Sequence, residues 1–245
     1  MLNPSNPVFN ESEWADIRLM TTDRMTVEGT AVKSLVLLGI ICATGVMAVM
    51  MTLQNPAIGM TLMIVGMLGG LVTALVLIFS AKEKAPVLAP IYAAFEGLFL
   101  GPITLMYAYL YDGVVLSAIS LTIGIAITMG LLHTHRIIRM THGMKMALSA
   151  AVAGIFLVYI VDMFLWFMGA PIAILRSSSP LGIGLSLVIV VIASFCLLMD
   201  FEFIENGAKQ GLPKHMEWYA AFGLVVTLIW LYLELLRLLA KIQRR

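Results

Sequence analysis

Charge is scarce in this 245-residue chain: Asp, Glu, Lys and Arg make up only 12% of it, while 61% of the residues are hydrophobic. A soluble domain carries roughly twice that charged fraction. The net charge is +1, which argues against nucleic acid or another polyanion as a partner. Cysteine is also rare, and Cys42 and Cys196 each stand inside an apolar run. Small buried hydrophobes are therefore expected there, rather than a disulfide or a metal site.

Long apolar runs are abundant in the chain. A helix that crosses a bilayer needs about 20 mostly apolar residues, and runs of this length, bounded by charge, Gly and Pro, recur along the sequence. They predict an all-α, polytopic membrane protein built as a bundle of seven transmembrane helices. The expected helices are Val32–Leu53, Ile58–Phe79, Val87–Tyr111, Val114–Leu132, Met146–Met168, Leu181–Ile204 and Trp218–Ala240. Residues 1–31 are expected to form a cytoplasmic N-terminal arm, and residues 32–245 a single transmembrane domain.

Lys and Arg are distributed unevenly among the connections. With seven spans, the arm and the second-to-third, fourth-to-fifth and sixth-to-seventh connections share one side, and all of them carry basic residues. The opposite connections contain only Arg176. Because basic loops stay in the cytoplasm, the N-terminus is predicted to be cytoplasmic. The C-terminal "KIQRR" then lies outside, against the same rule.

Glycine and proline add local expectations for helix packing. Gly66 and Gly70 are four residues apart, as are two glycines of the third predicted helix, and in lipid this spacing favours close helix contact. Pro90 and Pro102 stand within that third helix. A bent or broken helix is expected there, since proline removes a backbone donor.

Four of the acids within the predicted spans lie away from the span ends or about one turn inside them: Glu96, Asp162, Asp200 and Glu234. A charge at mid-bilayer costs about 2.5–3.5 kcal/mol on insertion scales, so each acid is a functional candidate by default. Glu234 has Arg237 three residues on, which also fits a structural ion pair. Asp162 fits a hydrogen-bonded packing role equally well. Asp200 and Glu96 have no basic neighbour in sequence and are the strongest candidates.

None of the remaining polar residues indicates an enzyme. Glu202 and Glu205 lie next to the predicted interface, where a solvated helix end is expected. His133, His135 and His142 stand in a basic juxtamembrane loop that suits lipid headgroups better than zinc. The sequence has no Cys–His spacing, phosphate-binding glycine loop or nucleophile elbow. We therefore predict a protein without catalytic residues or a cofactor.

Three motifs carry a family resemblance: "YAAFEGLFLGPI", "LLMDFEFIENG" and "EWYAAFGLVVTLIWLYLELLRLL". Together with the seven-span layout, they resemble the bacterial branch of the Bax inhibitor-1 family, the transmembrane Bax-inhibitor-motif proteins. The resemblance implies a pH-sensitive calcium leak channel in the bacterial inner membrane. It further implies a gating pair of acids, which maps to Asp200 in "MDF" and to Glu234 in "LYLE". The second acid is Glu where the family has Asp, and the interval between the two is about ten residues longer than usual.

Such a pair has a simple physical rationale. Two carboxylates that share a low-dielectric site cannot both ionise cheaply, so the pair holds a proton or exchanges it for a divalent cation with oxygen ligands. Asp200 and Glu234 are therefore the predicted calcium ligands and proton sensors. Counting depth along the helices puts Glu96 roughly level with Asp200, as a third member of the site. Glu202, Asp162 and Arg237 are accessory candidates.

The leading hypothesis is a calcium leak channel or exchanger, with the lipid bilayer, Ca²⁺ and H⁺ as its partners. The alternative is a non-conducting regulator that binds a membrane protease or a stress-response partner. A transporter of another solute is a third reading. The acids within the spans favour conduction, because a pure scaffold has no need of them.

Overall fold

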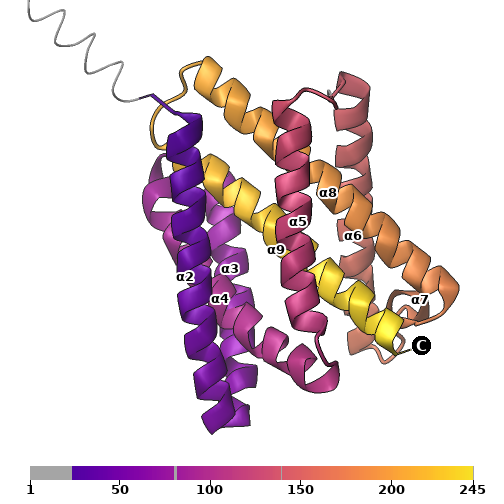
Figure 1. Ribbon diagram of the computed structural model, residues 1–245. Coiled ribbons are helices and arrows are strands. Elements are labelled where there is room, and N and C mark those ends of the chain that lie inside the picture. Colours follow the sequence, from indigo (N-terminus) through magenta and orange to yellow (C-terminus); the bar gives the residue numbers. More distant parts are fainter. Residues whose placement is uncertain (1–23, 80–81, 139, 245) are drawn as a thin grey trace, which may run out of the picture.

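The computed structural model describes residues 24–79, 82–138 and 140–244. Seven of the helices in these residues are long and apolar enough to cross a membrane (Figure 1). They are α2 (Val27–Gln54), α3 (Pro56–Phe79), α4 (Ala85–Leu110), α5 (Val114–Thr134), α6 (His142–Phe167), α8 (Pro180–Lys209) and α9 (Met216–Gln243). Two short helices, η2 (Lys82–Lys84) and α7 (Ala173–Arg176), lie in connections. The predicted all-α architecture with seven spans is confirmed.

Helix boundaries differ from the prediction by a few residues. The two largest differences are of five residues each. α2 starts at Val27 instead of Val32, within the residues assigned to the N-terminal arm. α8 continues to Lys209 instead of ending at Ile204, so that Glu205 lies inside a helix. α4 is one unbroken helix that passes through both Pro90 and Pro102. Of the bent or broken helix expected there, a break is not found, because the turns around both prolines remain helical.

Short polar side chains fix where helices begin. The Thr26 hydroxyl accepts a 2.9 Å hydrogen bond from the backbone N–H of Gly29 at the start of α2. Ser179 caps α8 in the same way, accepting from Gly182 N–H at 3.2 Å, and Pro180 follows at the first helical position. Such caps satisfy backbone donors that a helix start leaves free. They allow a helix to begin at the edge of the apolar region.

Glycine lets α2, α3 and α4 approach closely. Gly97 of α4 faces the backbone of α2, where a Cβ atom would come within 2.5 Å of the Ile41 carbonyl oxygen. Gly66 of α3 faces α4, and a Cβ there would lie 2.5 Å from the backbone nitrogen of Phe99. These contacts leave no room for a larger residue, in agreement with the packing role predicted from the glycine spacing.

α9 is the central helix of the bundle and α6 is an outlying one. α9 packs against α2, α4, α5 and α8, with apolar clusters along it. α6 packs against α8, and none of its residues is buried. In a bilayer the apolar surface of α6 can be covered by lipid, so its position depends on a few polar contacts.

Candidate functional site

A cavity of about 720 Å³ lies between the α3–α4 pair and the α8–α9 pair. Its walls are almost entirely apolar side chains and glycine. Two acids interrupt this lining: Glu96 of α4 and Asp200 of α8. The structure thus brings together two of the carboxylates that the sequence singles out.

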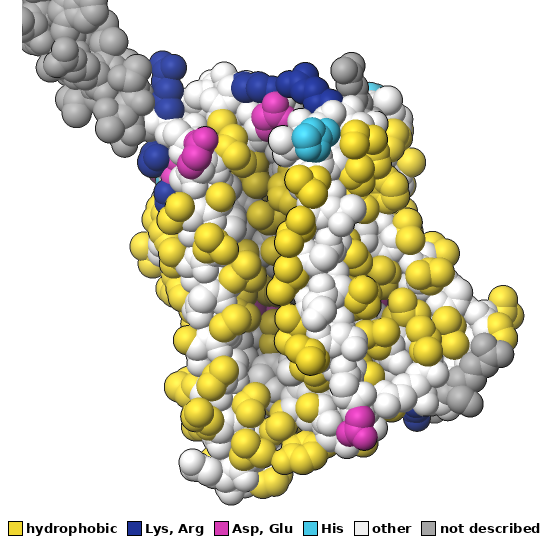
Figure 2. Space-filling model, viewed as in Figure 1, with side chains coloured by type: hydrophobic (Ala, Val, Ile, Leu, Met, Phe, Trp, Pro, Cys, Tyr) yellow, Lys and Arg dark blue, Asp and Glu magenta, His cyan; other side chains and the backbone are white. Residues whose placement is uncertain are grey.

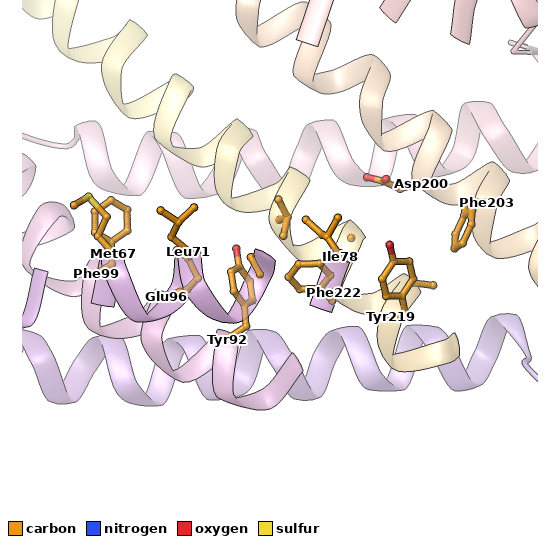
Figure 3. Close-up of a pocket in the computed structure, with 15 residues that line it drawn as sticks. Met67, Leu71, Ile78, Tyr92, Glu96, Phe99, Asp200, Phe203, Tyr219 and Phe222 are labelled. Carbon is orange, nitrogen blue, oxygen red and sulfur yellow. The ribbon is translucent and has the colours of Figure 1, made fainter. Parts of the chain in front are cut away.

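Asp200 occupies one end of the cavity, with Phe203 and Tyr219 around it (Figure 3). The Thr227 hydroxyl of α9 lies beside its carboxylate. The Oδ2 atom is buried, and it has no hydrogen-bond partner among the described residues. Buried polar atoms in native proteins nearly always have a partner. An unsatisfied carboxylate oxygen at a cavity therefore calls for a proton, a water molecule or a cation.

Glu96 lies toward the other end of the same cavity. Its side chain lies over Gly70 of α3, where a Cβ atom would come within 3.1 Å of Oε1. Tyr92, one turn earlier on α4, is a hydrogen-bonding neighbour of the carboxylate. Figure 3 shows the rings of Tyr92 and Phe222 between Glu96 and Asp200. The two acids are thus successive positions along one cavity rather than a pair in direct contact.

Glu234 belongs to a different cluster and does not line this cavity. Its Oε1 atom accepts hydrogen bonds from Tyr159 Oη at 2.7 Å and Trp230 Nε1 at 3.2 Å. Arg237 Nη1 donates to its two oxygens at 2.9 and 3.0 Å. The ion pair suggested by the spacing of three residues is therefore present, and it leaves the Glu234 carboxylate fully engaged.

The chain connection explains why Asp200 and Glu234 do not meet. A short connection joins α8 to α9, so the two helices run back along each other. This places Asp200 beside Thr227. Glu234 is seven residues further along α9, a rise of about 10 Å. The structure therefore does not bring the two predicted calcium ligands together.

The accessory acids connect α6 to the rest of the bundle. Asp162 Oδ1 accepts hydrogen bonds from the backbone N–H of Ile172 and from Arg176 Nη1, both at 2.8 Å. Glu202 of α8 accepts a 2.7 Å hydrogen bond from Lys145 of α6. These contacts fix the two ends of α6. They suit a structural role, which the sequence left open for Asp162.

Glu217 is a buried acid that the sequence interpretation missed. It is 0% exposed at the start of α9. It accepts hydrogen bonds from the backbone N–H and the hydroxyl of Thr26, each at 2.8 Å, and forms ion pairs with Lys33 and Lys214. Only Lys214 is close in sequence, so the pattern could not reveal that Glu217 joins α9 to the start of α2.

No preformed metal cage is found in the described part of the chain, where no three His, Cys, Asp or Glu side chains converge. Calcium takes six to eight oxygen ligands in its protein sites. A cavity that offers one carboxylate at each end suits brief contact with a partly hydrated cation better than tight binding.

The fold and the site define an integral, multi-pass helical membrane protein with acidic side chains inside its spans. A protein-family model described as Bax inhibitor 1 like matches residues 6–244. This is nearly the whole chain, and the chain therefore belongs to the Bax inhibitor 1-like family, as its motifs indicated. A comparison with curated proteins finds no match.

Proposed function

We propose that the protein is a pH-sensitive leak channel or exchanger for cations, calcium among them. The observation that carries the proposal is the buried Oδ2 atom of Asp200, which faces a cavity and has no partner among the described residues. Glu96 supplies a second carboxylate to the same cavity. Membership of the Bax inhibitor 1-like family supports a membrane protein of this kind.

The chemistry follows from the surroundings of the two acids. An ionised carboxylate in an apolar cavity is costly unless a counter-charge is near. A cation that enters the cavity supplies that charge, and a proton removes the need for it. Protons and cations therefore compete for Asp200 and Glu96. This competition makes conduction depend on pH without any further sensor.

The proposed setting is the bacterial inner membrane, with the N-terminus in the cytoplasm. Lys and Arg side chains gather at the end of the bundle where the α5–α6 and α8–α9 connections lie, as Figure 2 shows. Basic connections remain on the cytoplasmic side. This supports the orientation that the sequence predicts.

A non-conducting regulator is the second candidate function. It is favoured by α6, an apolar helix that packs against α8 and has no buried residue. Such a surface suits a membrane-embedded partner, for example a membrane protease. In this reading the acids of the spans serve to hold the bundle together. Neither function includes a catalytic step, so we propose that the protein is not an enzyme.

Calcium flux into liposomes tests the proposal. Purified protein is reconstituted with a calcium indicator inside, and influx is recorded at several pH values against protein-free liposomes. The leak channel predicts protein-dependent influx that changes with pH and is lost in Asp200→Asn. Folded protein that admits no calcium at any pH contradicts conduction and favours the regulator.

A further inference from the structure

A second cavity, of about 400 Å³, lies between α2 and α5. α8 and α9 form its floor through Phe201, Ile204 and Leu224, and Ala31 of α2 contributes to one wall. Its volume is within the range of about 300–1,000 Å³ that ligand sites occupy. In Figure 2 the surface between these two helices is hollowed and lined by hydrophobic side chains.

This groove lies within the region that faces lipid. α2 and α5 are both candidate membrane spans, and they do not pack against each other as neighbouring helices do elsewhere in the bundle. The polar lining residues of the groove can hold water, but the floor formed by Phe201, Ile204 and Leu224 offers water no hydrogen-bond partner, so water is a poor occupant of that floor. An acyl chain from the surrounding bilayer is a good one.

The groove ends in a polar rim on the side of the basic connections. Glu205 of α8 accepts a 2.9 Å hydrogen bond from His133 and also pairs with Lys209. Arg136 lies 3.6 Å from the same carboxylate, beyond hydrogen-bonding distance, and its side chain is 65% exposed. One carboxylate thus faces several basic groups, which leaves an excess of positive charge, and the Arg136 guanidinium makes no hydrogen bond within the described part of the chain. Lys, Arg and His side chains gather at this end in Figure 2.

The backbone at Arg136 allows the role of its side chain to be tested separately from the fold. Arg136 has a φ of 53°, in the left-handed region. It ends α5 with hydrogen bonds from Ile137 N to Leu132 O at 3.1 Å and from Arg136 N to His133 O at 3.0 Å. This is the helix-ending position that glycine usually occupies, because a Cβ atom is unfavourable there. Arginine is less favourable than glycine at this φ, so replacing Arg136 with glycine removes the guanidinium without a loss of backbone stability.

We propose that this groove binds an anionic phospholipid of the leaflet on the side of the basic connections. The phosphate lies against Arg136 and His133, and one acyl chain occupies the apolar floor. Basic pockets between transmembrane helices are suited to such headgroups, and the planar guanidinium matches phosphate geometry. This site does not depend on conduction through the cavity of Asp200.

The test measures the melting temperature of purified protein in neutral detergent with dioleoyl phosphatidylglycerol, dioleoyl phosphatidylcholine or inorganic phosphate. Native mass spectrometry counts the phosphatidylglycerol molecules that remain bound. Three variants are compared with the unmodified chain: Arg136→Gly, Ala31→Trp to fill the groove, and Lys84→Gln. The last removes a positive charge from η2, outside the groove but at the same end of the bundle.

We expect phosphatidylglycerol to raise the melting temperature by several degrees more than phosphatidylcholine does, with no effect of inorganic phosphate. Arg136→Gly should melt at or above the unmodified chain without lipid, because glycine suits the backbone, yet lose the extra shift and the bound lipid. Ala31→Trp should lose both while keeping every charge, and Lys84→Gln should keep both. Equal shifts with the two lipids, or a full shift in Arg136→Gly, would overturn the proposal. A shift produced by inorganic phosphate alone would assign a free anion instead of a lipid.

Discussion

Tyr159 of α6 donates a 2.7 Å hydrogen bond to Glu234 of α9, and Arg237 donates to the hydroxyl of Tyr159 at 2.6 Å and to both Glu234 oxygens. Glu234 is 1% exposed, and the Arg237 guanidinium balances its charge within this cluster. Asp200 has no such balance. The two acids that a gate would couple thus have different surroundings: Glu234 is paired with the Arg237 guanidinium, and Asp200 faces a cavity.

Glu234→Gln should reduce stability more than it alters the pH dependence of calcium flux. It leaves Arg237 without its counter-charge. The expected loss in unfolding free energy is about 2 kcal/mol, below the roughly 3–5 kcal/mol of fully buried pairs, because the Arg237 side chain is 37% exposed. Tyr159→Phe removes one hydroxyl and should cost about 1 kcal/mol. Thermal unfolding in detergent measures both losses. A flattened pH profile in folded Glu234→Gln would instead return this residue to the gate.

Asp200→Asn should abolish most of the pH dependence of calcium flux. The amide keeps the shape of the side chain but can neither attract a cation nor take up a proton. Flux should stay low at every pH, whereas the unmodified protein should conduct less as acidification protonates its carboxylates. Glu202→Gln is the matched control, because Glu202 is nearby on α8 but outside the cavity and paired with Lys145. A normal pH profile in Asp200→Asn would exclude the cavity as the pathway.

Glu96→Gln should move the pH midpoint of flux to a lower value. Asp200 then no longer shares the cavity with a second negative charge, so it releases its proton more readily. The shift should be modest, because Tyr92 and Phe222 lie between the two acids (Figure 3). Flux titrations of the single and double variants measure it. If the midpoint does not move, Glu96 has no part in the site.

The sequence predicted the spans well because each one is a local property. Long apolar runs define seven helices, and the three-residue spacing predicts the ion pair of Glu234 with Arg237. Depth counting also related Glu96 to Asp200, since residues at similar depth in a bundle can line one cavity. These inferences need only distances along single helices.

Contacts between distant helices could not be predicted in this way. In lipid, the outer surface of a bundle is as apolar as its core, so a span does not reveal which of its faces points inward. The bonds that join Glu217 to Lys33, 184 residues apart, and Tyr159 to Glu234, 75 residues apart, depend on these unseen orientations. The pairing of Asp200 with Glu234 came from the family resemblance. A resemblance gives the residue types at each position, but it does not give the direction in which each helix faces.

Membrane topology gives a prediction that is independent of conduction. In a variant without Cys42 and Cys196, a cysteine introduced at Ala170, in the exposed α6–α7 connection, should react with an impermeant thiol reagent added from outside. One introduced at Gln210, in the exposed α8–α9 connection, should react only after the membrane is permeabilised. The expectation rests on the basic connections at the Gln210 end of the bundle. The reverse labelling pattern would invert the proposed orientation.

Substitution of two glycines on α2 tests whether Glu217 fastens α9 to the start of that helix. A Cβ atom at Gly29 would collide with Glu217 Oε1, whereas one at Gly39 meets nothing within 4 Å. Gly29→Ala should therefore displace the carboxylate from Thr26 and Lys33 and lower the unfolding free energy by about 1–3 kcal/mol. Gly39→Ala makes the same change of residue on the same helix, and it should be neutral or stabilising by up to about 1 kcal/mol. Glu217→Ala, which leaves Lys33 and Lys214 without a counter-charge, should also lower the stability, and Gly29→Ala in that background should add little, because the side chain that its Cβ would meet is gone. Thermal unfolding of all four variants decides the matter: equal stability of Gly29→Ala and Gly39→Ala would mean that the Glu217 cluster does not hold the two helices together.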